Sequence, residues 1–198
     1  MNKARTMACA VRECRRSRNV RTRHAILLCS VLLSTLAPWS SGQMQDERAV
    51  RAAFVYNLTK YVEWPRPGSE LVIGFVGEGS MGGILEKMLV GKTSASRTIR
   101  VLLSPSDEQF AQCNVLYVAQ ASSEQIHSAL DKARNKGILT VGETASFPRE
   151  GGMIGLVRAG DQILIQVNLD VVQEARLKIS SRLLNLSTIV RTGKGPKD

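Results

Sequence analysis

The sequence predicts a single-domain α/β fold, a three-layer sandwich in which helices cover both faces of a largely parallel sheet. Two observations predict it. Short apolar runs alternate with helical segments between residues 70 and 141, an order that favours right-handed crossovers between parallel strands. Two further strand-like runs near the C-terminus are separated by only three residues, which is typical of an antiparallel hairpin.

The first helix of this domain is predicted over residues 48–64. Apolar residues recur there at three- and four-residue spacings, so one stripe can face a core. The stripe consists of Ala49, Val50, Ala53, Phe54, Asn57, Leu58, Tyr61 and Val62. We expect the polar residues outside it, Arg51, Thr59, Lys60 and Glu63, to face solvent. Pro65 disfavours helical geometry at Trp64, so the helix should end there.

Four apolar runs of strand length follow, at residues 70–77, 98–103, 114–119 and 138–141. Helices are predicted between them at residues 79–90 and 122–136, with a short turn or helix that begins at Ser104. Ser122 and Ser123 are typical helix N-cap residues, and Gly137 is a typical C-terminal glycine.

The C-terminal part of the domain changes pattern. Residues 153–158 and 162–169 should form the hairpin, since Ala159-Gly160-Asp161 between them is a tight-turn sequence. One helix is then predicted over residues 170–191, because apolar residues return to helical spacing. Residues 193–198 should form a flexible tail.

Residues 1–42 resemble a secretory signal peptide, which would leave residues 43–192 as the α/β domain. A basic region precedes a short apolar core at residues 25–36, and small residues follow it. That core is shorter than the about 20 apolar residues that span a bilayer, so cleavage near Gly42 is favoured over an uncleaved anchor. We therefore expect a periplasmic protein that does not insert into the membrane after cleavage.

Most of the formal charge of +10 lies in this leader, and this argues against a nucleic-acid partner. The leader holds eight Lys or Arg and one Glu, so the rest of the chain carries only +3. Three cysteines, Cys9, Cys14 and Cys29, also lie in the leader. The mature chain would keep Cys113 alone and could form no intramolecular disulfide. We expect Cys113 to be a buried structural residue.

The glycine-rich turn at residues 77–83 follows a strand and precedes a helix, but its spacing does not fit the dinucleotide fingerprint. Gly77, Gly79 and Ser80 could still bind an anion or small ligand there, the alternative being an ordinary turn. His127 would be the one histidine of the mature chain, which argues against a metal site or a Ser-His-Asp arrangement. No cofactor is predicted, and binding or regulation is favoured over catalysis.

Several motifs occur in an order that resembles the YfiR family of exported regulatory proteins. They are Tyr61–Pro65, the strand that ends at Gly77, Cys113–Val118, Leu139–Glu143, Gly151–Ile154, Gln166–Leu169 and Ile179–Leu184. The resemblance implies a periplasmic protein without enzymatic activity. It implies that the protein binds the periplasmic sensor domain of an inner-membrane diguanylate cyclase and represses it, lowering cyclic-di-GMP and biofilm formation. The alternative is a periplasmic sensor module for a small ligand.

The chain departs from that family at its cysteines. Members tend to pair a first-strand cysteine with the one at the Cys113 position, but the first-strand position here is about Gly74. A second pair, expected between Glu143 and Met153, is also missing, so redox control is not implied for this chain.

Partner contacts are expected at the end of the first helix and on the last helix, where aromatic and basic residues typical of interaction hot spots occur. These residues are Tyr61, Trp64, Arg176, Lys178 and Arg182. The alternative places both aromatic residues in the core and the three bases in solvent. The sequence leaves a homodimer open.

Overall fold

The structure is a computed structural model that describes residues 40–65 and 68–191, with only the backbone of residues 40–46. The chain divides into two compact units, Met1–Gln43 and Met44–Asp198, and the fold below is that of the second unit. The predicted signal peptide lies almost wholly outside the described residues, as does the predicted tail. Both remain predictions.

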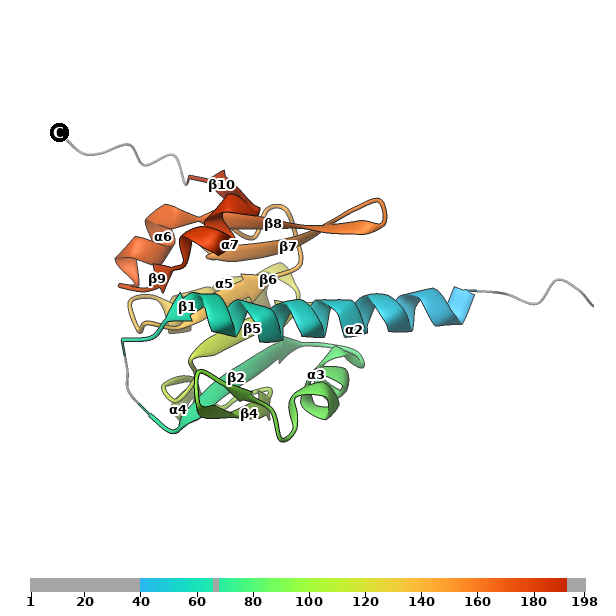
Figure 1. Ribbon diagram of the computed structural model, residues 1–198, viewed down its shortest axis with the longest axis horizontal. Helices are drawn as coiled ribbons and strands as arrows, with labels where there is room; N and C mark the ends of the chain where they lie inside the picture. Colours follow the sequence, from blue (N-terminus) through green and yellow to red (C-terminus); the bar gives the residue numbers. More distant parts are fainter. Residues whose placement is uncertain (1–39, 66–67, 192–198) are drawn as a thin grey trace, which may run out of the picture. The chain divides into compact units, whose positions relative to one another are not determined.

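One mixed sheet of eight strands forms the centre of the fold, and its strands run in the order β10-β8-β7-β6-β5-β2-β4-β3. Figure 1 shows them from β10 at the top to β4 at the bottom. In chain order they are β2 (Glu70–Gly77), β3 (Thr93–Ser94), β4 (Arg97–Leu103), β5 (Val115–Ala119), β6 (Leu139–Gly142), β7 (Ile154–Ala159), β8 (Gln162–Asn168) and β10 (Ser187–Val190). Five of the seven strand pairings are parallel. The antiparallel β7–β8 hairpin is confirmed.

The order of strands creates a crevice at one edge of the sheet. β2 pairs with β4 on one side and with β5 on the other, so the connection from β4 to β5 crosses over β2. Open α/β sheets commonly bind ligands at the carboxyl ends of strands where the order reverses in this way. Here that position is the end of β2 at Gly77 and the end of β5 at Ala119.

Helices cover both faces of the sheet, which confirms the three-layer sandwich. The first face packs against α2 (Ser40–Leu58), α3 (Met81–Leu89), α6 (Leu169–Glu174) and α7 (Ser181–Asn185). The second face packs against α4 (Asp107–Phe110) and α5 (Ser123–Ala133). β5 shows why two cores form: Val115 and Tyr117 enter the first core, whereas Leu116 and Val118 enter the second.

The first helix ends earlier than predicted, and its buried face differs. α2 stops at Leu58 and is followed by a 3-10 turn, η2 (Thr59–Tyr61), and by strand β1 (Val62–Glu63). β1 pairs antiparallel with β9 (Lys178–Ile179), so ladder hydrogen bonds replace the last helical turn. The buried face contains Ala52, Val55, Leu58, Thr59 and Arg51, whereas Val50 and Asn57 are exposed.

The prediction of a single helix over residues 170–191 is wrong. The segment forms α6, β9, α7 and β10 instead. Arg176 has a φ of 58°, a left-handed conformation that cannot continue an α-helix. β10 contains Thr188, Ile189 and Val190, whose branched side chains favour strands, and it pairs in parallel with β8. The hairpin is therefore not the edge of the sheet.

Candidate functional site

The two-stranded ladder of β1 and β9 joins the end of the first helix to the C-terminal segment. Val62 faces Ile179 and Glu63 faces Lys178 across this ladder. The backbone N–H of Ser180 donates to the carbonyl oxygen of Tyr61 at 2.8 Å, which extends the ladder by one residue. Segments more than one hundred residues apart in the sequence therefore form one surface (Figure 1).

This ladder brings together most of the residues predicted to contact a partner. Tyr61 precedes β1, Trp64 follows it, and both are half-buried against the first core. Lys178 lies on β9 opposite Glu63, and Arg176 lies in the turn before β9, so neither is helical as predicted. Arg182 lies on α7, and all three basic side chains are exposed.

We call Arg176, Lys178 and Arg182 the basic patch. Lys178 Nζ lies 3.7 Å from Glu63 Oε2, but both side chains are about 80% exposed, so water screens this pair. Among the described residues, Arg176 and Arg182 form no ion pair. The indole nitrogen of Trp64 is buried beside this surface without a hydrogen-bond partner in the described part of the chain. The surface thus offers positive charge next to an aromatic residue.

The glycine-rich turn lies at the crevice of the sheet, and its glycines have a structural role. A Cβ atom on Gly77 would lie 1.6 Å from the carbonyl oxygen of Ala119, and Gly77 and Gly79 both have positive φ angles. Only glycine fits that close approach. Ser80 does not cap α3 with its side chain; its hydroxyl accepts a hydrogen bond from Arg48 Nη1 at 2.7 Å.

A buried polar network next to this turn was missed from the sequence. Arg51 is only 8% exposed, and its Nη1 donates to the carbonyl oxygen of Leu156 at 2.8 Å. Its Nε and Nη2 donate to Glu47 Oε1 at 3.2 and 2.8 Å, and Arg158 Nη1 donates to Glu47 Oε2 at 2.5 Å. Arg51 Nη1 also lies 3.8 Å from Glu143 Oε1.

Tyr117 completes the network from β5. Its hydroxyl donates to Glu143 Oε1 at 2.5 Å, and its ring packs 6.0 Å from that of Phe75, centroid to centroid. Burial raises the pKa of Tyr117 well above its ordinary value, and the negative charge of Glu143 adds to this effect. Hydrogen bonding from Arg51 lowers the pKa of Glu47, although burial opposes the shift. Charged hydrogen bonds therefore tie α2 to β7. The ion pair between Arg51 and Glu143 links α2 to the end of β6 and, through Tyr117, to β5.

A small cavity of about 110 Å³ adjoins this network at the crevice. It is lined by Glu47, Arg48, Arg51, Met81, Gln120 and Glu143. Its walls carry two bases and two acids, so opposite charges surround it in equal number.

The sequence contains one signal for the polar network. Glu47 and Arg51 are four residues apart, the spacing of paired charges on one face of a helix.

Cys113 lies in the second core, as expected, and is fully buried. Its thiol donates to the carbonyl oxygen of Gln109, with sulfur and oxygen 3.4 Å apart. A Cβ atom built on Gly74 would lie 2.8 Å from this sulfur. The first-strand position expected from the family resemblance is therefore within contact distance of the Cys113 sulfur.

Within residues 47–65 and 68–191, no three His, Cys, Asp or Glu side chains gather in a way that could hold a metal ion. No helix in the described part of the chain is long and apolar enough to cross a membrane.

The structure is that of an α/β domain with no three metal-ligating side chains gathered among its described residues. Comparison with known families identifies it more closely: the YfiR/HmsC-like family matches residues 48–188. The chain belongs to this family, a family of regulatory proteins. No curated protein matches the sequence.

One solved structure with a match is the ABC domain in complex with L-Trp from Streptococcus pneumonia, which is 12% identical to this chain. The match covers 72% of this chain and 60% of that one, with a TM-score of 0.47. A similarity at this level supports neither a fold nor a function.

Proposed function

We propose that this protein is a periplasmic negative regulator of a membrane-bound diguanylate cyclase. Membership of the YfiR/HmsC-like family is the observation that carries the proposal. The protein binds the periplasmic sensor domain of the cyclase, and this lowers cyclic-di-GMP and biofilm formation. It reaches the periplasm through a signal peptide that is cleaved near Gly42, and it acts without catalysis of its own.

The contact with the cyclase uses the basic patch together with Tyr61 and Trp64. Arginine and aromatic residues are enriched at interaction hot spots, and the β1–β9 ladder holds them on one surface. A regulator can shift its partner only by binding one state more tightly than the other, and about 1.4 kcal/mol of preference changes the ratio of states tenfold. The protein therefore prefers the inactive state of the cyclase.

Gene deletion tests this function. Loss of the protein should raise intracellular cyclic-di-GMP and surface attachment, because the cyclase is released from repression. Deleting the partner cyclase as well should abolish the rise. Unchanged cyclic-di-GMP in the single deletion, under conditions where the wild-type strain makes the protein, would refute the proposal.

A second candidate function is a small-ligand sensor at the glycine-rich turn. The observation in its favour is the cavity at the carboxyl ends of β2 and β5, beside Arg48 and Ser80. Calorimetric titration with inorganic phosphate separates the two functions. Saturable binding that Arg48→Met removes, together with normal cyclic-di-GMP in the deletion strain, would favour the sensor.

A further inference from the structure

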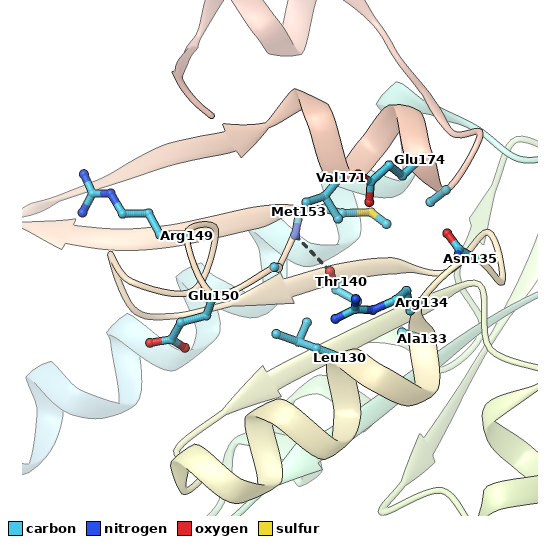
Figure 2. Close-up of a pocket in the computed structure, with 12 residues that line it drawn as sticks. Leu130, Ala133, Arg134, Asn135, Thr140, Arg149, Glu150, Met153, Val171 and Glu174 are labelled. Atoms are coloured by element: carbon cyan, nitrogen blue, oxygen red, sulfur yellow. Dashed lines mark hydrogen bonds between the residues drawn. The ribbon is translucent and has the colours of Figure 1, made fainter. Parts of the chain in front are cut away.

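A second, larger cavity of about 310 Å³ lies apart from the sites described so far. It is enclosed by the C-terminal end of α5, the loop at residues 149–153 and α6, with strand β6 at its base (Figure 2). No residue of the basic patch, of the glycine-rich turn or of the polar network lines it. Its volume is within the range of about 300–1,000 Å³ found for small-molecule pockets.

The inner wall of this cavity is apolar. It is lined by four apolar residues, each at most 6% exposed: Leu130, Ala133, Met153 and Ala175. Val171 of α6 lies opposite Leu130 of α5 across the opening (Figure 2). A ligand that fills this space would remove apolar surface from water, which favours binding.

One polar group, Thr140 of β6, lies at the base of the cavity and is only 2% exposed. Its hydroxyl oxygen accepts a hydrogen bond from the backbone N–H of Met153 at 2.9 Å (Figure 2). The hydroxyl forms no second hydrogen bond among the described residues, so its hydrogen has no acceptor within that part of the chain. A buried donor without an acceptor is costly, and a ligand acceptor in the cavity would satisfy it.

The rim carries charges that cancel. The opening is lined by two basic residues, Arg134 and Arg149, and by two acidic residues, Glu150 and Glu174. Arg134 is already hydrogen-bonded to Asp131 at 3.2 Å, and its side chain is 65% exposed, so water screens its charge. The opening therefore selects neither anions nor cations, and the apolar wall disfavours both.

We propose that this cavity binds a neutral, largely apolar small molecule that carries one carbonyl oxygen. The apolar body contacts Leu130, Met153 and Val171, and Thr140 donates its hydroxyl hydrogen to the carbonyl. Thr140 thus acts as acceptor for the Met153 N–H and as donor to the ligand at the same time, which satisfies both of its hydrogen-bonding roles.

Fluorescence titration with prodan, a neutral naphthyl ketone whose emission shifts in apolar surroundings, tests this site on the purified protein. We expect saturable 1:1 binding with a blue-shifted emission. Thr140→Val removes the donor at nearly constant volume and should weaken binding about fivefold, the effect of one hydrogen bond. Thr140→Ser, which keeps the hydroxyl, should retain most of the affinity.

Val171→Phe gives an independent variant, because its ring would fill the cavity without touching Thr140's hydrogen bond to Met153. It should abolish prodan binding while the melting temperature stays near that of the wild type. Absence of saturable binding to the wild-type protein would overturn the proposal. Unchanged binding in a folded Val171→Phe variant would overturn it as well. Neither result bears on the proposed regulation, since no cyclase is present in the assay.

Discussion

At the scale of single residues, Gly74 and Cys113 show how closely this chain approaches a disulfide that it does not form. The separation of 2.8 Å between a Cβ at position 74 and the Cys113 sulfur is close to the about 3 Å that disulfide bond lengths and angles impose. A Cβ atom at position 74 is therefore at about the distance from the Cys113 sulfur that a disulfide requires, although the sequence supplies only one of the two cysteines.

We predict that Gly74→Cys forms a disulfide with Cys113 on mild oxidation. Closing a loop of this length should stabilise the fold by about 2–4 kcal/mol relative to the reduced variant. Urea denaturation with and without reductant measures the difference, and thiol labelling of the denatured protein counts the remaining thiols. Gly74→Ala is the matched control: it adds the same Cβ crowding, so it should be destabilised equally under both conditions. Two labelled thiols after oxidation would contradict the prediction.

At the scale of elements, the polar network fixes α2 on the sheet and makes stability depend on pH. Because the pKa of Glu47 is lowered from its ordinary 4.5, its ionised form stabilises the fold above that pH. This contribution is lost as the pH falls below about 4.5 towards the folded-state pKa. Asp107, whose pKa is lowered by its hydrogen bond from Lys132, acts in the same direction at the surface.

Glu47→Gln should therefore lower the free energy of unfolding at pH 7 by about 1 kcal/mol, since Arg51 and Arg158 lose their charged partner. The loss of stability between pH 5 and pH 3 should also become shallower, without disappearing. Chemical denaturation across this pH range measures both effects. A variant with the same pH dependence as the wild type would show that another carboxylate is responsible.

The sequence predicted the elements of the sheet better than the elements that pack at its ends. Strands β2, β5 and β6 are short, largely apolar runs, and such runs indicate burial on both faces directly. β1 and β9 have two residues each and exist because they pair with each other. A pairing between segments this distant leaves no periodic pattern in the sequence. The helical spacing of the neighbouring residues therefore predicts one helix that runs through β1 and another that runs through β9.

The same reasoning explains which site residues could be found. The predicted partner contacts stand out by residue type, whereas the surface that they share depends on the β1–β9 ladder. These residues are Tyr61, Trp64, Arg176, Lys178 and Arg182. Residue type predicts a solvent-exposed Arg51, because a charged residue is rarely buried unless it is paired. Its partners Leu156 and Glu143 are a backbone carbonyl and a carboxylate about one hundred residues away. Only the folded chain brings them together.

At the scale of the whole molecule, the proposed function requires a contact surface on the protein and no reaction of its own. The basic patch lies in the C-terminal segment that pairs with β1, whereas the exposed bases Lys87 and Lys92 lie on α3 and just after it. Reversing two charges on either surface changes the net charge equally. Any difference between the two double variants therefore reports the location of the contact and not the total charge.

The most direct test is the intracellular cyclic-di-GMP concentration in a deletion strain that is complemented with either double variant at equal periplasmic levels. Arg176→Glu with Arg182→Glu should leave cyclic-di-GMP as high as in the uncomplemented deletion, while the purified variant keeps its melting temperature. Lys87→Glu with Lys92→Glu should restore the wild-type level. Full repression by the Arg176→Glu, Arg182→Glu protein would contradict the assignment of the basic patch as the contact with the cyclase.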